Sequence, residues 1–238
     1  MVWQRIGVFV LGILAGSMLN RFISRWPEEQ GVDNGFQSVC PHCGHPWHGL
    51  EQISIWVRLF SEGRCQYCGD HIPLRHILVE LSTGALFLLV SMRGRGTLDL
   101  VRLFLFVLLL VPLFFIDLKH HRLPNILTMP GIGLGLALSA GLGQIKSALA
   151  GVIVGGGVLF IVALVTRGGI GMGDAKLQAM VGAFLGLRLM LISLTIGVIL
   201  GGIVGLFLLA LQVRGRKDMI PYGPFLITGA ILTLLMAG

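Results

Sequence analysis

The chain has few charged residues. Of its 238 residues only 12% are Asp, Glu, Lys or Arg, whereas 55% are hydrophobic and the mean hydropathy is +0.87. A soluble domain carries about 25% charged residues, so this composition excludes an ordinary soluble globular protein. It predicts an all-α polytopic membrane protein whose main surroundings are the lipid bilayer.

Acidic residues are scarcer than basic ones. There are 11 Asp and Glu against 18 Lys and Arg, which gives a formal charge of +7. A protein that binds nucleic acid gathers its basic residues on one face or along one stripe. Here they are scattered through short loops, which favours a role in membrane orientation and excludes a nucleic-acid partner.

Long apolar runs dominate the rest of the sequence. The first run lacks a small-residue cleavage site, and we interpret it as a retained helix rather than a signal peptide. Most runs approach the roughly 20 residues that a helix needs to cross a bilayer, so the sequence predicts about eight transmembrane helices. A run of only eleven residues, Leu177–Leu187, is expected to be a broken or partly buried helix that crosses only by including Gly173–Lys176. The eight runs are Ile6–Ile23, Ile77–Met92, Leu98–Ile116, Ile126–Leu142, Ile145–Thr166, Leu177–Leu187, Leu189–Val213 and Pro221–Met236.

The distribution of cations predicts the orientation. One side of the membrane, which carries the loops at 24–76, 117–125, 167–176 and 214–220, has 12 Lys and Arg, and the other side has 5 or 6. The side richer in cations faces the cytoplasm. Both termini are therefore predicted outside, with the Arg93/Arg95 pair as the main exception to the count.

Four acids lie in or beside the apolar runs: Glu80, Asp99, Asp117 and Asp174. Asp99 stands one helical turn from Arg102, which favours a surface ion pair. Asp117 ends one run in "FFIDLKHHRLPN", and Asp174 begins another in "GMGDAKL". The predicted topology brings both to the cytoplasmic boundary of the membrane, where an acid is usually functional or paired.

Two neighbouring carboxylates suit general acid–base hydrolysis. They cannot both ionise easily, so one keeps a proton while the other takes a proton from water that attacks a peptide carbonyl. Gly171 and Gly173 would let a substrate backbone approach. The alternative is structural: each Asp caps a helix or pairs with Lys119 or Lys176, and Asp174 is well placed to cap.

All four cysteines lie in two knuckles, "CPHCG" and "CQYCG", which contain Cys40, Cys43, Cys65 and Cys68. Two C-x-x-C pairs separated by 21 residues are typical of a zinc site. Four thiolates close the coordination sphere, so such a zinc is structural. The alternatives are two disulfides or a redox pair, which a cytoplasmic loop disfavours. His42, His45 and His48 lie nearby as replacement ligands or as a solvated loop face.

The motifs together resemble a known family. They are similar to the motifs of type IV prepilin peptidases, the GxGD aspartic proteases of bacterial membranes, and they occur in the same order. In chain order they are "GSMLNRFISRWP", the cysteine knuckles, "IPLRHILVELSTG", "D…LPN", "GMGDAKL" and "PYGPFL". The resemblance implies that Asp117 and Asp174 are the catalytic aspartates, with Gly171, Gly173, Lys176 and Glu80 in support.

The resemblance also implies a function and a domain plan. The enzyme would cleave the leader of type IV prepilins or pseudopilins at the bacterial cytoplasmic membrane, with its active site facing the cytoplasm. It would then N-methylate the new N-terminus with S-adenosylmethionine. Residues 1–24 would form the first transmembrane helix, 25–76 a cytoplasmic zinc-binding loop linked to methylation, and 77–238 the peptidase domain. Glu80 would either pair with an Arg or bind the new amino group or the methyl donor.

Two other functions use the same residues. An ion-coupled transporter also has membrane acids and broken helices, but it predicts acids near the midplane and repeated halves, and no internal repeat is evident. A zinc-loop scaffold that only recruits partners leaves the glycine-flanked Asp174 unexplained.

Overall fold

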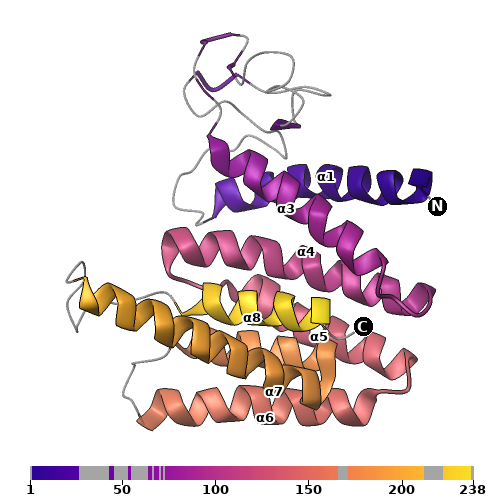
Figure 1. Ribbon diagram of the computed structural model, residues 1–238, viewed down its shortest axis with the longest axis vertical. Coiled ribbons are helices and arrows are strands. Elements are labelled where there is room, and N and C mark those ends of the chain that lie inside the picture. Colours follow the sequence, from indigo (N-terminus) through magenta and orange to yellow (C-terminus); the bar gives the residue numbers. More distant parts are fainter. Residues whose placement is uncertain are drawn as a thin grey trace. The chain divides into compact units, whose positions relative to one another are not determined.

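The structure is a computed structural model and is all-helical in the part of the chain that it describes. It describes residues 2–26, 43–45, 53–54, 64–65, 67–69, 71, 73–165, 171–211 and 222–236. In these residues there are seven helices and one isolated bridge, between Arg64 and His71 (Figure 1). The helices are α1 (Val2–Arg25), α3 (Leu74–Ser91), α4 (Thr97–His120), α5 (Asn125–Gly141), α6 (Ile145–Val165), α7 (Met172–Ala210) and α8 (Gly223–Met236).

The contacts divide the chain into two units, Met1–Met92 and Arg93–Gly238. In the first unit α1 and α3 cross closely (Figure 1). A Cβ on Gly12 would lie 2.7 Å from the Cα of Gly84, and one on Gly16 would lie 2.8 Å from the Cα of Glu80. Small residues at such a crossing let two backbones pack without hydrophobic side chains between them. The first unit thus contains both α1 and α3. The predicted boundary between a zinc-binding loop that ends at residue 76 and a peptidase domain that begins at residue 77 stays a prediction.

The first part of α7 is the centre of the second unit. Residues 177–186 are all buried, so this helix is surrounded on every side. Glycines at 151 and 155 bring α6 against it, and those at 131 and 135 bring in α5. Phe106 of α4 stacks on Phe184 with ring centroids 4.8 Å apart. The expectation of a buried short helix that includes residues 173–176 in its first turn is confirmed.

The helix α7 breaks at Gly186, whose φ of 77° and ψ of 174° are not helical. A Cβ on Gly155 would lie 2.9 Å from the main-chain oxygen of Gln178 and 3.0 Å from the sulfur of Met190. A straight helix would separate those two residues by about 18 Å. The chain therefore turns back at Gly186, and the hydroxyl of Ser147 accepts the Leu187 N–H that the break releases, at 3.2 Å.

This break explains how eight apolar runs become seven helices, since the sixth and seventh runs together form α7. Five helices in the described residues are long and apolar enough to span a membrane: α1, α3, α4, α6 and α7. The apolar helices α5 and α8 are shorter. The chain is thus a multi-pass membrane protein, and the number of eight crossings stays a prediction.

We expect Gly186→Ala to destabilise the second unit. The backbone there is essentially closed to residues with a Cβ, which costs about 1–3 kcal/mol, and the new methyl would lie 2.6 Å from the Ser147 Oγ. The melting temperature in detergent should fall by about 5 °C or more. Gly133→Ala is the matched control because a Cβ there meets nothing within 4 Å. An unchanged melting temperature for Gly186→Ala would show that the turn at α7 tolerates an ordinary residue.

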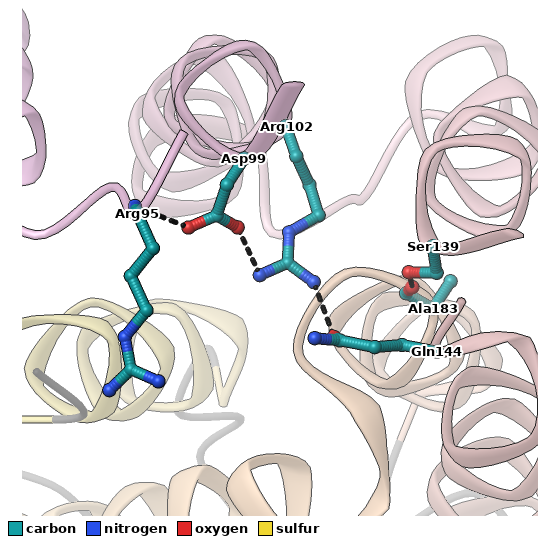
Figure 2. A network of polar contacts seen from close by, with 6 residues as sticks. All are labelled: Arg95, Asp99, Arg102, Ser139, Gln144 and Ala183. Carbon is teal, nitrogen blue, oxygen red and sulfur yellow. Dashed lines mark hydrogen bonds and ion pairs between the residues drawn. The ribbon is translucent and has the colours of Figure 1, made fainter. Parts of the chain in front are cut away.

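A polar network ties together one end of the second unit (Figure 2). Asp99 pairs with Arg102 at 2.6 Å and accepts the Arg95 N–H at 3.1 Å, which confirms the predicted ion pair. Arg102 also donates to Gln144, between α5 and α6, at 3.0 Å. Nearby, Ser139 donates to the carbonyl of Ala183 at 2.8 Å. The Arg102–Gln144 bond fixes the N-terminal end of α4 against the α5–α6 connection, and the Ser139–Ala183 bond fixes α5 against the first part of α7.

Candidate functional site

Asp117 lies in the last turn of α4, where the chain is forced to leave the helix. His121 follows in the left-handed conformation, with φ 53°, and its N–H bonds to the Asp117 carbonyl at 2.9 Å. Such a cap ends a helix, and Pro124 then precedes the start of α5. The Asp117 side chain is only 5% exposed, and its Oδ2 has no hydrogen-bond partner by distance and angle among the described residues. A buried oxygen of this kind points to a functional role.

Asp174 lies in the first turn of α7. Its main-chain N–H bonds to the Gly171 carbonyl at 3.0 Å, and its carboxylate faces the Gly171 N–H in return. The carboxylate also stands at the positive end of the helix dipole. The capping role predicted for Asp174 is therefore present. The capping contact involves Oδ2 of the carboxylate, because a Cβ on Gly171 would lie 3.5 Å from that oxygen.

Gly223, the first residue of α8, brings the two acids together. A Cβ placed on it would lie 3.0 Å from the Asp117 Cγ and 3.5 Å from the Asp174 Oδ1. Both carboxyl groups thus lie within 3.5 Å of one point, which is within reach of one bridging water. The Gly223 N–H is directed at the Asp117 carboxylate, and the charge of Asp117 acts on Asp174. The predicted meeting of these acids at one end of the bundle is confirmed.

Tyr222 borders the same site. Burial raises the pKa of its phenol, and the nearby Asp174 carboxylate raises that pKa further. Its ring packs toward α7, because a Cβ on Gly201 would lie 2.8 Å from the Tyr222 Cε2. Sequence reasoning used "PYGPFL" only as one of the motifs that resemble the type IV prepilin peptidases. It missed Gly223 and Tyr222 as site residues, although this motif contained the signal.

The other predicted support residues lie in different surroundings. Gly173 packs on Leu123, whose Cβ would be 3.1 Å from a Cβ at that glycine. Lys176 donates to the Asn125 side chain at 2.9 Å and thereby joins the start of α7 to the start of α5. Gly171 borders Asp174 as described. Glu80 belongs to the first unit.

Glu80 is fully buried between α1 and α3. Its Oε1 accepts the main-chain N–H of Ser54 at 2.8 Å and the Asn20 side-chain amide at 3.4 Å. The Asn20 amide also donates to the His76 carbonyl at 2.8 Å. Glu80 therefore ties the loop between α1 and α3 to the two helices. The two roles predicted for Glu80, an Arg pair and the binding of the new amino group or the methyl donor, stay predictions.

Three cysteines form a separate cluster in the first unit. The sulfur atoms of Cys43, Cys65 and Cys68 all lie within 4.8 Å of one another, so the three could hold a metal ion. The Cys43 and Cys65 sulfurs are 3.9 Å apart, close to the spacing in a tetrahedral thiolate site. Cys40, the fourth predicted ligand, lies outside the described residues, as do His42 and His48.

The turns of this cluster match the sequence argument. Gly44 and Gly69, each directly after the second cysteine of its knuckle, have φ values of 70° and 75°. The Gly69 N–H bonds back to the Cys65 carbonyl at 2.9 Å and closes the second turn. The His45 ring packs against the Tyr67 ring, tilted by 30°, with ring centroids 3.4 Å apart. Among the described residues, His45 is not part of the cysteine cluster.

Comparison with known proteins assigns both parts of the chain. Residues 10–94 match the Bacterial Peptidase A24 N-terminal domain, and residues 103–206 match the Type IV leader peptidase family. No solved structure matches the chain.

Curated relatives agree with these matches. Proteins described as "Prepilin leader peptidase/N-methyltransferase" from Aeromonas hydrophila and Dichelobacter nodosus are 34% and 35% identical to this chain. These alignments cover 96% and 97% of this chain and 89% and 92% of the relatives. One from Myxococcus xanthus is 40% identical over 85% of this chain, which spans 62% of that relative. The chain belongs to the type IV leader peptidase family and is an enzyme of its prepilin leader peptidase/N-methyltransferase kind.

Proposed function

We propose that Asp117 and Asp174 are the catalytic pair of this peptidase. The observation that supports the pair most directly is that both carboxyl groups lie beside Gly223. Each has an atom within 3.5 Å of the point where a Cβ on Gly223 would stand. The ionised carboxylate takes a proton from water, and the water oxygen bonds to the scissile carbonyl carbon. The protonated carboxyl polarises the carbonyl oxygen, the C–N bond breaks, and a proton passes to the leaving amine.

We propose a prepilin or pseudopilin as the substrate, cleaved at the cytoplasmic face of the bacterial inner membrane. The aspartates, the start of α5 and the start of α8 lie at one end of the second unit, and the loops at that end carry most of its cations. The excess of cations assigns that end to the cytoplasm. With the turn at Gly186 counted, eight crossings keep both aspartates on this side.

Methylation of the new N-terminus is the proposed second activity. It requires S-adenosylmethionine as the methyl donor. No glycine-rich turn between a strand and a helix occurs in the described residues, so no methylation step is assigned to particular residues. Glu80 is the buried acid that anchors Ser54 to α3, and we assign it to the support of this activity.

The cysteine cluster is proposed as a structural zinc site with Cys40 as the fourth ligand. Three thiolates at the observed spacing fit zinc well, and a fourth thiolate would leave no open position for catalysis. The metal would close the loop between α1 and α3 onto itself. This role is consistent with the position of the cluster outside the unit that carries the aspartates.

The transporter alternative is less well supported. It places membrane acids near the bilayer midplane, whereas Asp117 and Asp174 lie at the ends of their helices beside Gly223. A scaffold function would not require two carboxyl groups beside a glycine.

A cleavage assay in detergent tests the proposed function. The full chain is mixed with a prepilin, and mass spectrometry records the released leader and the mature product with and without S-adenosylmethionine. The proposal expects a single cleavage and, with the cofactor, a product heavier by one methyl group. A prepilin that stays intact with the folded wild-type chain would refute the peptidase assignment.

We expect Cys65→Ser to release the metal and to lower methylation more than cleavage. Serine is a poor zinc ligand, and Cys65 is the buried member of the cluster. Elemental analysis should find about one zinc per wild-type chain and much less in the variant. Cleavage should change less than twofold because the aspartates belong to the other unit. Equal loss of both activities would contradict this division of roles.

A further inference from the structure

The two helices that carry the acids are joined differently at their two ends. Deep in the second unit, α4 and α7 meet where Phe106 stacks on Phe184. Roughly three turns of helix, about 15 Å, separate that stack from Asp117 on α4 and from Asp174 on α7. Contacts nearer the acids must therefore set the distance between the two carboxyls.

The α4–α5 connection meets the first turn of α7 at two points. Leu123 packs on Gly173, because a Cβ on that glycine would lie 3.1 Å from the Leu123 Cβ and 3.5 Å from its Cδ1. At the start of α5, the Asn125 Oδ1 accepts a hydrogen bond from the Lys176 ammonium at 2.9 Å. The two α7 residues lie on either side of Asp174 in the sequence, so these contacts hold the turn that carries this acid.

The same connection begins at the other acid. Asp117 lies in the last turn of α4, and the His121 N–H bonds to its carbonyl at 2.9 Å where the helix ends. Only Arg122 separates His121 from Leu123. A shift of the connection away from α7 would therefore reach Asp117 through a few residues of a capped turn.

The Lys176 ammonium is directed at α5 and not at the neighbouring acid. Residues two apart on a helix do not face each other, and the ammonium is engaged by Asn125. Among the described residues, the groups whose charge or hydrogen bond acts on the Asp174 carboxylate are Asp117 and Gly171. Lys176 is therefore not the electrostatic partner of Asp174.

We propose that these two contacts, Leu123 on Gly173 and Asn125 on Lys176, form a clamp that sets the separation of the two catalytic carboxyls. Lys176 is then a positioning residue, and Gly173 admits Leu123 rather than a substrate backbone. The inference rests on the proposed catalytic pair. Two carboxyls can share one water only over a narrow range of distances, and displacing a catalytic group by about 1 Å can cost about 10²-fold in rate.

Lys176→Met tests the polar half of the clamp, because methionine keeps an unbranched side chain and removes the ammonium. We expect kcat for prepilin cleavage by the full chain in detergent to fall about tenfold, with KM within twofold of wild type. Asn125→Ala should give the same loss, and the double variant should be no slower than either single variant because both remove one contact. Lys176→Arg, which keeps a donor at the end of the side chain, should recover most of kcat.

Gln144→Ala is the matched control for the polar half. It removes the side-chain acceptor that Arg102 reaches at 3.0 Å, at the opposite end of the second unit. The melting temperature should fall about as much as in Lys176→Met, whereas kcat should stay within twofold of wild type. This comparison separates positioning of the acids from a general loosening of the helices.

Gly173→Ala tests the apolar half. The new methyl would lie 3.1 Å from the Leu123 Cβ and would push the connection away by a few tenths of an ångström. We expect kcat to fall about tenfold, again with little change in KM. Gly133→Ala in α5 is the control, because a Cβ there meets nothing within 4 Å, and its kcat should equal that of wild type.

The kinetic pattern decides the outcome. A raised KM with unchanged kcat in Lys176→Met would show that the ammonium binds the substrate, and it would overturn the clamp. Losses in Lys176→Met and Asn125→Ala that multiply in the double variant would overturn it as well. If Lys176→Met and Gly173→Ala keep the wild-type kcat while Asp117→Asn and Asp174→Asn lose cleavage, the catalytic pair stands and only the clamp is refuted. Cleavage that survives in both aspartate variants would instead refute the pair, and the role of the clamp with it.

Discussion

Asp117→Asn and Asp174→Asn should each lower the rate of prepilin cleavage by on the order of 10⁴-fold. Asparagine keeps the shape of the side chain but can neither take a proton from water nor pass one to the leaving amine. Because the two carboxyls act as a unit around one water, the double variant should be little slower than either single variant. Single-turnover cleavage in detergent, with enzyme in excess over prepilin, measures the rates without interference from product release.

The matched control is Asp99→Asn. Asp99 is also an aspartate in α4, but it pairs with Arg102 at the opposite end of that helix. Loss of an ion pair between residues one turn apart costs only a few tenths of a kcal/mol, so cleavage should stay within twofold of wild type. Melting temperatures of all variants confirm that they fold. Cleavage that survives in both folded single variants would mean that Asp117 and Asp174 only cap and position their helices.

The fold was predictable wherever local chemistry decides it. Apolar runs of sufficient length became helices close to their predicted ends. The acid at "FFID" fell in the last turn of α4 because His121 and Pro124 end the helix there. The glycines after Cys43 and Cys68 have the positive φ values that tight knuckles need.

The remaining features depend on contacts that no local pattern contains. Gly186 resembles the many other glycines of the chain, and the turn there is set by Ser147 of α6, 39 residues earlier in the sequence. The buried state of Gln178 depends on packing between helices, such as the close approach of Gly155 in α6, rather than on its neighbours in sequence. Gly223 approaches the acids because α8 begins beside the end of α4 and the start of α7. "PYGPFL" contributed to the family resemblance, but sequence alone did not indicate that its glycine would lie against both carboxyls.

Gly223→Ala should reduce cleavage by about 10²-fold or more while the chain stays folded. The new methyl would lie 3.0 Å from the Asp117 Cγ and 3.5 Å from the Asp174 Oδ1. To make room, the Asp117 carboxyl must move out of the position it shares with Asp174 and with the Gly223 N–H. Displacing a catalytic group by about 1 Å can cost about 10²-fold in rate. The water between the acids would also lose its space.

Gly202→Ala is the control for this substitution, because a Cβ at that position of α7 meets nothing within 4 Å. Its cleavage rate should equal that of wild type. The kinetic pattern also distinguishes the cause, since a displaced acid lowers kcat, whereas a blocked entrance mainly raises KM. If Gly223→Ala cleaves at the wild-type rate, the carboxyls either lie farther from α8 than the structure places them or do not act on the same water, and the assignment of the pair would have to be abandoned.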